Sequence, residues 1–232
     1  MPRIPLLLLP GLLCDRALWQ SQINDLNDVA DCQVADLGRH DTLSAMAASV
    51  LATAPPRFAL AGLSMGGYLA LEILRQAPGR VSRLALLSTS ARADTPEQSQ
   101  RREDLMALAR QGRFKGVTPR LLPLLLHPDR LTDQALVDTV MGMAERVGAA
   151  AFLRQQSAIV QRPDGRALLP GVRCPSLVLC GRQDALTPLE RSLEIADAIP
   201  GARLSVLEHC GHLSALEHPT RVSAALRAWL ED

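Results

Sequence analysis

The sequence predicts an α/β protein with a mostly parallel sheet of about six strands, flanked by helices. Two observations support this prediction: short runs rich in Leu or β-branched residues recur along the chain, and stretches with helical periodicity lie between them. The runs are Ile4 to Leu9, Cys32 to Leu37, Phe58 to Leu63, Leu84 to Ser88, Ser176 to Cys180 and Leu204 to Leu207.

The helical stretches have recognisable ends. One of them places Leu69, Ile73 and Ala77 on a single apolar stripe and stops at Pro78-Gly79. The alternation of strands and helices breaks only once, from about Ala91 to Leu169, where four helix-like segments follow one another. The first segment begins with Thr95-Pro96-Glu97-Gln98, which resembles a capping box, and the others begin at Thr118, Thr132 and Ala149.

This break predicts how the chain is divided. We expect a core made of residues 1–91 and 169–232, and a helical cap of residues 92–168 inserted between the fourth and fifth strands. The cap is expected to lie over the C-terminal edge of the sheet, where ligands bind in open α/β sheets. The alternative is an additional helical layer that only contributes stability.

Composition restricts the classes of partner. The chain has 232 residues, of which 47% are hydrophobic and 21% charged, and its net charge is +1. Such a balance suits a soluble globular protein and provides no field that would gather nucleic acid or an anionic membrane. Because only 3% of the residues are aromatic, a substrate pocket must have mainly aliphatic walls. We expect a small-molecule substrate, and both monomer and dimer remain open.

The cysteines and the first residues carry no sign of export or metal binding. Five cysteines form no Cys-X-X-Cys and lie mostly in or beside apolar runs, so neither disulfides nor a zinc site are expected. The apolar run before Pro10 is short for a signal peptide, and no segment reaches the ~18 apolar residues of a membrane span. No Gly-X-Gly-X-X-Gly follows the first strand, so no nucleotide cofactor is implied. We expect a cytoplasmic protein.

The most informative motif is Gly62-Leu63-Ser64-Met65-Gly66. It directly follows a predicted strand and directly precedes a predicted helix, which is the setting that a serine nucleophile elbow requires. Serine needs a base, and the base needs an acid to fix its tautomer. Downstream, Asp184 and His212 each follow a predicted strand, so the chain order is Ser, Asp, His.

These motifs resemble the α/β-hydrolase fold superfamily along nearly the whole chain. The resemblance implies Ser64 as the nucleophile, His212 as the general base and then acid, and Asp184 as the carboxylate that orients His212. It also implies that the backbone N–H groups of Leu12 and Met65 form an oxyanion hole. The chain departs from many relatives at Pro10, where a histidine is common, which raises the question of what positions this loop.

Other side chains compete for these roles. Glu208, Glu217 and, less plausibly, Asp94 are alternative acids, and Asp184 has a second interpretation as a helix cap. The alternative bases are His209 and His218; His40 and His127 suit the role less well, and His127 is instead a residue of the cap that touches substrate or lies at its surface.

We therefore predict a serine hydrolase that cleaves a carboxylic ester of a small apolar substrate through an acyl-enzyme. A thioesterase or a carbon–carbon bond (β-diketone-type) hydrolase uses the same triad and remains open. A ligand-binding receptor that kept the fold and lost turnover is the alternative of another class.

Overall fold

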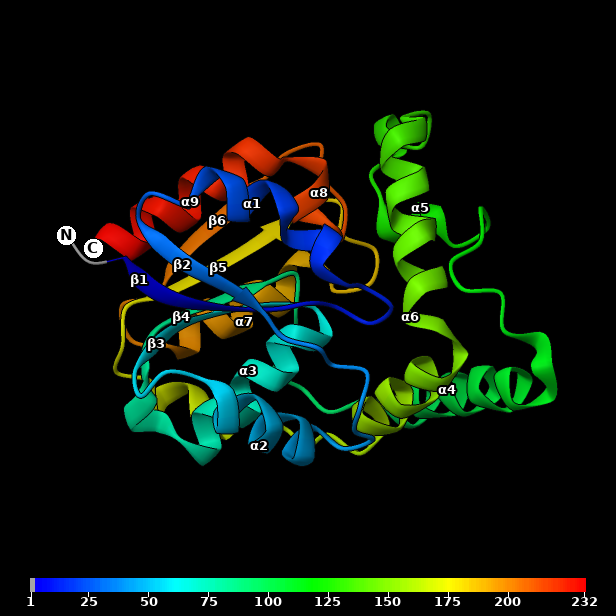
Figure 1. The fold of residues 1–232 in the computed structure, drawn as a ribbon, viewed down its shortest axis with the longest axis horizontal. Coiled ribbons are helices and arrows are strands. Elements are labelled where there is room, and N and C mark those ends of the chain that lie inside the picture. The colour runs from blue at the N-terminus through cyan, green and yellow to red at the C-terminus, as the bar shows by residue number, and fades with distance from the viewer. Residues whose placement is uncertain (1–2) are drawn as a thin grey trace.

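A six-stranded parallel sheet forms the centre of the protein in the computed structural model, which describes residues 3–232 (Figure 1). Every neighbouring pair of strands runs parallel, in the order β2-β1-β3-β4-β5-β6. The strands are β1 (Ile4–Leu9), β2 (Ala30–Val34), β3 (Phe58–Leu63), β4 (Val81–Leu87), β5 (Ser176–Gly181) and β6 (Arg203–Leu207). The predicted fold class is confirmed. Residues 1 and 2, with which the predicted core begins, lie outside the described residues.

One predicted strand is displaced. The second strand ends at Val34, although the apolar run continues to Leu37. Leu37 is buried because it packs in the loop after the strand, together with Leu7 and Leu9 on one face of the sheet. The apolar pattern therefore predicted the burial of Leu37 correctly, but it predicted the bounds of this strand incorrectly.

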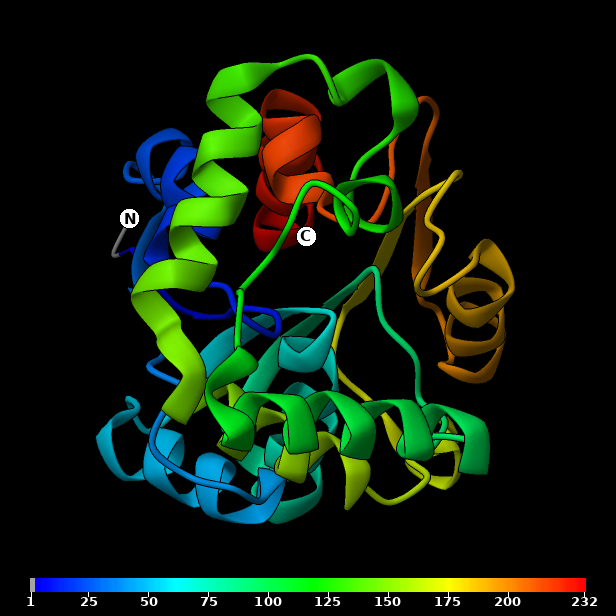
Figure 2. The same ribbon diagram turned by 90° about the vertical axis from the view of Figure 1, so that its right-hand side faces the viewer.

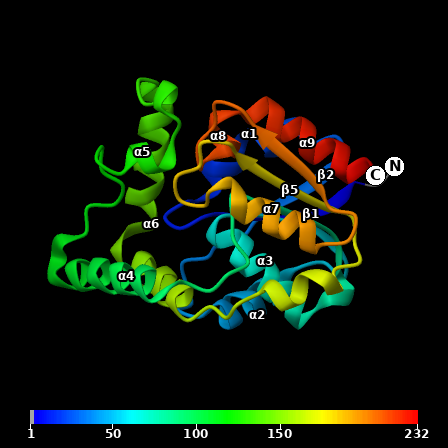
Figure 3. The same cartoon turned by 180° about the vertical axis from the view of Figure 1, so that it is seen from behind.

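The sheet separates two apolar clusters, because successive strand residues point to opposite faces. In β1, Leu6 and Leu8 belong to one cluster, whereas Leu7 and Leu9 belong to the other. The first face is covered by α1 (Gln20–Asp25), α8 (Ser214–Glu217) and α9 (Pro219–Glu231), and the second by α2 (Leu43–Thr53), α3 (Met65–Gln76) and α7 (Leu189–Ala198) (Figures 1 and 3). Burial on both faces explains why β1, β3 and β5 are apolar almost throughout, whereas the edge strands β2 and β6 contain exposed polar residues.

The helices between β4 and β5 lie beyond the C-terminal ends of the strands (Figures 1 and 2). They are α4 (Pro96–Leu108), α5 (Leu122–Leu125) and α6 (Gln134–Val160). Thr95 and Gln98 form the predicted capping box at the start of α4. The second predicted segment contains only the single turn α5 and a 3-10 turn at Pro128–Arg130, and the last two form α6, which bends at Gly148 with φ 74° and ψ 172°.

Shorter helical turns complete the chain. They are 3-10 turns at Arg16–Trp19, Pro78–Arg80, Pro128–Arg130 and Arg166–Gly171, and a π-helical turn at Ala109–Arg113. Across residues 3–232, no helix has both the length and the apolar character needed to cross a bilayer.

Candidate active site

Ser64 occupies the tight turn between β3 and α3. Its backbone has φ 56° and ψ −116°, a conformation that is unfavourable for a residue with a side chain. The turn is held from β4 and the segment after it: the Ser64 N–H donates to the Leu87 carbonyl at 3.0 Å, and the Thr89 hydroxyl donates to the Ser64 carbonyl at 2.8 Å. The Ser64 hydroxyl makes no capping hydrogen bond to α3.

Two glycines allow this turn to form. A Cβ atom on Gly62 would collide with the backbone of Gly66, and one on Gly66 would collide with the carbonyl of Leu9 at the end of β1. The start of α3 therefore packs directly against β1 and β3. This close approach is the physical reason for the Gly-X-Ser-X-Gly spacing.

His212 and Asp184 form a buried pair. Nδ1 of His212 lies 2.9 Å from Oδ2 and 3.0 Å from Oδ1 of Asp184. Asp184 follows β5 and His212 follows β6, so the pairing of these neighbouring strands brings the two loops together. The residues are 4% and 3% exposed, respectively. A carboxylate on Nδ1 holds the imidazole proton there and leaves Nε2 able to accept a proton.

The environment keeps Asp184 ionised. Burial alone would raise its pKa, but the charge and hydrogen bond of His212, together with hydrogen bonds from Thr187, lower the pKa below its ordinary value. Thr187 donates through its N–H at 2.8 Å and its hydroxyl at 2.7 Å, and the Leu186 N–H donates at 2.9 Å. Asp184 therefore orders its own loop while it orients His212.

The competing acids and bases are placed differently. Glu208 is exposed and pairs with Arg182 at 2.6 Å. Asp94 pairs with Arg102 at 2.6 Å and Arg162 at 2.7 Å. His209 is exposed, and Nε2 of His218 lies 2.8 Å from the backbone carbonyl of His209. Of the acids considered from the sequence, Asp184 is the one hydrogen-bonded to His212.

Glu217 has a role that the sequence did not reveal. Its buried carboxylate accepts hydrogen bonds from the N–H groups of His127, at 2.7 Å, and Gly211, at 3.0 Å. The N–H groups of His212 and Leu213 both donate to the Leu125 carbonyl at 3.1 Å. Segment 125–127, at the end of α5, is thereby joined to the loop that carries His212. Burial raises the pKa of Glu217, although these two hydrogen bonds oppose the effect.

The loop after β1 passes beside Ser64. A Cβ atom built on Gly11 would lie 3.5 Å from the Ser64 Cβ, so the segment containing Leu12 borders the turn of Ser64. The Leu13 N–H donates to Oε1 of Gln155 in α6 at 3.1 Å, and Nε2 of Gln155 donates to the Leu37 carbonyl at 3.3 Å. Gln155 is 2% exposed. A side chain of the helical insertion therefore fixes the loop that follows Pro10.

Cys14 lies in the same loop but is a poor competitor for the nucleophile role. Burial, reinforced by the negative charge of Asp15, raises the pKa of its thiol to about 12. Because the thiolate is the reactive form, the thiol is inert at neutral pH. Cys14 instead packs in the apolar cluster with Leu13 and Leu213.

The helical insertion adds apolar side chains to that cluster. They are Ala109, Val117, Leu122, Leu126, Leu136, Val137, Val140, Met143, Ala144 and Phe152. The side chains that the insertion contributes to this cluster are therefore aliphatic, except for Phe152.

Comparison with known proteins gives consistent matches. A family model described as the alpha/beta hydrolase family matches residues 7–225. A pimeloyl-[acyl-carrier protein] methyl ester esterase from Nitrosomonas europaea is 28% identical and covers 92% of this chain and 90% of its own, and one from Aromatoleum aromaticum is 30% identical, covering 78% and 77%. A thermophilic esterase from Thermogutta terrifontis, solved with malate bound, superposes with a TM-score of 0.88 at 30% identity and covers 98% of this chain and 89% of its own.

Proposed function

The chain belongs to the alpha/beta hydrolase family, and from this premise we propose that it is a serine esterase that cleaves a carboxylic ester of a small, mainly apolar substrate. The observation that carries the proposal is the buried His212–Asp184 pair in the loops after β6 and β5, together with the strained turn of Ser64 at the C-terminal end of β3 in the same parallel sheet. A non-catalytic receptor has no use for either feature, since both cost stability.

In the proposed reaction, Oγ of Ser64 attacks the ester carbonyl carbon while its proton passes to Nε2 of His212. Asp184 stabilises the imidazolium that forms. The N–H groups of Leu12 and Met65 donate hydrogen bonds to the former carbonyl oxygen, which now carries the negative charge. His212 then protonates the departing alcohol oxygen, and the carbon–oxygen bond of the ester breaks to leave an acyl group on Ser64.

Water completes the cycle by the same groups. His212 takes a proton from the attacking water, the water oxygen bonds to the acyl carbon, and Ser64 leaves with the proton that His212 returns. The products are a carboxylic acid and regenerated serine. This sequence requires neither a metal ion nor an organic cofactor.

Two observations favour an ester over the alternatives. The named relatives act on methyl esters or are called esterases, and the aliphatic side chains of the insertion suit an apolar acyl chain. Thioester and carbon–carbon bond hydrolysis would use the same three residues, so they are distinguished only by the substrate.

The experiment is a substrate panel. Short p-nitrophenyl esters, methyl esters of medium-chain acids, acyl thioesters and β-diketones are offered to the wild type, to Ser64→Ala and to Ser49→Ala. Ser49 is an exposed serine of α2, so its substitution controls for general damage. We expect ester turnover in the wild type and in Ser49→Ala, and none above background in Ser64→Ala. Equal product release by wild type and Ser64→Ala would refute the serine mechanism. Faster turnover of thioesters or β-diketones than of esters would show that the substrate is not a carboxylic ester.

A further inference from the structure

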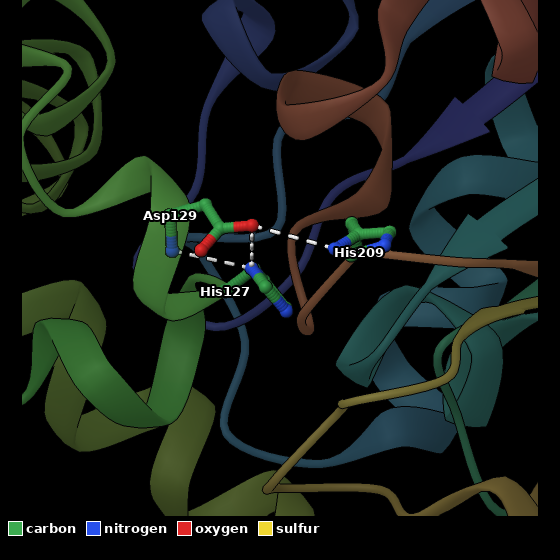
Figure 4. A group of neighbouring side chains, drawn as sticks. All are labelled: His127, Asp129 and His209. Atoms are coloured by element: carbon green, nitrogen blue, oxygen red, sulfur yellow. Dashed lines mark hydrogen bonds and ion pairs between the residues drawn. The ribbon is translucent and has the colours of Figure 1, made fainter.

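A second group of polar side chains lies where the helical insertion meets the loop of His212. It consists of His127 and Asp129, from the segment between α5 and α6, and His209, from the loop after β6 (Figure 4). Oδ2 of Asp129 lies 3.4 Å from Nδ1 of His127 and 3.4 Å from Nδ1 of His209. One ligand atom from each residue falls within 4.8 Å of the others.

These distances match the spacing of ligands around a metal ion. Zinc binds imidazole nitrogen and carboxylate oxygen at about 2.0–2.2 Å in tetrahedral sites, so two ligand atoms of one ion are separated by about 3.4 Å. Both Asp129–histidine distances already have this value. The two histidine nitrogens lie within 4.8 Å of each other, and the His209 side chain is 74% exposed, so its ring has room to turn toward the separation that one ion requires.

The chemical state of the cluster also suits a metal. The Asp129 N–H donates to Nδ1 of His127 at 3.2 Å, so the lone pair of this nitrogen is directed toward Asp129, and a metal ion would replace this hydrogen bond. Asp129 is 67% exposed, which opens the cluster to ions from solvent, whereas His127 is almost buried and its backbone is anchored by Glu217. The cluster therefore combines one fixed ligand with two accessible ones.

We propose that His127, Asp129 and His209 form a binding site for a divalent transition-metal ion such as Zn²⁺, with water as the remaining ligand. Two imidazoles and one carboxylate favour Zn²⁺, Ni²⁺ or Cu²⁺ over Mg²⁺ and Ca²⁺, which prefer oxygen ligands. None of the three residues belongs to the proposed triad, in which Nδ1 of His212 is occupied by Asp184.

A metal bound here connects two parts of the chain. Its ligands come from the helical insertion and from the position three residues before His212, so occupancy ties the insertion to the His212 loop. Leu125 and Glu217 already join these segments by hydrogen bonds. The metal would add a coordination link at the surface of the same contact.

Isothermal titration of metal-stripped, untagged protein with ZnCl₂ tests the proposal. We expect one equivalent of Zn²⁺ to bind and the melting temperature to rise, with no binding of Mg²⁺ at the same concentration. Asp129→Asn and His209→Asn should each weaken Zn²⁺ binding by about tenfold or more. Asparagine suits position 209 because the backbone there has φ 54°, which asparagine tolerates well.

His40→Asn is the matched control, since His40 lies outside the cluster and its loss should leave Zn²⁺ affinity unchanged. Circular dichroism of each variant shows that the fold is retained. The proposal is overturned if no Zn²⁺ binds at about 100 µM, a concentration on the order of the dissociation constant of a weak site. It is also overturned if binding survives both cluster substitutions, because the ion would then be held elsewhere, for example at His212. Neither outcome depends on esterase activity.

Discussion

Nδ1 of His212 lies 2.9 Å from Oδ2 of Asp184, in a pair from which water is almost excluded. In a serine hydrolase, such a pair holds the imidazole in one tautomer and stabilises its charged form during turnover. The properties expected of the protein follow from this pair and from the contacts that position it.

Replacing the carboxylate of this pair should reduce turnover far more than it reduces binding. Asp184→Asn preserves the size of the side chain but favours the wrong tautomer of His212, so we expect kcat to fall by about 10⁴-fold with little change in KM. Steady-state kinetics with a p-nitrophenyl ester measures this. Glu208→Gln, at an exposed acid, should retain activity. A similar loss in both variants, or less than a tenfold loss in Asp184→Asn, would exclude Asp184 from this role.

The strained turn at Ser64 should lower the free energy of unfolding of the protein. Ser64→Ala retains a side chain at φ 56°, whereas Ser64→Gly relieves the strain. We therefore expect Ser64→Gly to unfold with a free energy about 1 kcal/mol or more above that of Ser64→Ala, while both are inactive. Urea denaturation compares the two. Equal stability would show that the turn is unstrained in the folded protein.

Gln155 should influence catalysis without contacting the reacting atoms. Gln155→Met keeps the length of the side chain but removes the hydrogen bond to the Leu13 N–H, so the loop bearing Leu12 loses its anchor. The unpaired N–H should lower the free energy of unfolding by about 1–3 kcal/mol. If the loop supplies an oxyanion donor, kcat should fall by about tenfold with KM nearly unchanged, because the donor acts mainly in the transition state.

The control for this variant is Gln161→Met, at an exposed position near the end of α6. It should change neither stability nor kcat. A rise in KM alone in Gln155→Met would indicate that Gln155 shapes the pocket and does not position the loop.

Glu217 should give stability a distinct dependence on pH. Burial raises the pKa of Glu217 in the folded protein above its unfolded value, so the contribution of this group is fully present below the unfolded pKa and is lost as pH rises through the folded pKa. Glutamine cannot titrate. The destabilisation caused by Glu217→Gln should therefore be larger near pH 4 than near pH 8, by urea denaturation at both pH values. A penalty that grows with pH would show that the ionised form is the favoured one.

The contribution of Asp184 to the free energy of unfolding depends on pH in the opposite direction. Its folded pKa is lowered, so its contribution is present above the unfolded value and is lost as pH falls through the folded pKa. The comparison of Glu217→Gln with the wild type removes this contribution, because both proteins contain Asp184.

The sequence predicted the elements that depend on local pattern. Apolar runs located all six strands, and Thr95 with Gln98 located the start of α4, because burial and capping leave a direct trace in neighbouring residues. The second strand was wrong at its end, since Leu37 is apolar for packing in a loop. The apolar pattern of a sequence therefore predicts which residues are buried better than it predicts where a strand ends.

The contacts between the insertion and the core were not predicted. Gln155 lies 142 residues from Leu13, and Glu217 lies 90 residues from His127, so no local period links them. A weak signal was present: Gln155 is a polar residue among the buried positions Ala151, Phe152, Ala158 and Ile159 of α6. A polar side chain on an apolar helical stripe usually satisfies a backbone group of a distant segment.

The most direct test of the central claim is intact-mass spectrometry after reaction with an organophosphonate, which bonds covalently to an activated serine. We predict a single adduct on the wild type, mapped by peptide analysis to Ser64, and much slower labelling of Asp184→Asn. An unlabelled wild type, or an adduct that persists in Ser64→Ala, would contradict the assignment of Ser64 as a nucleophile activated by His212 and Asp184.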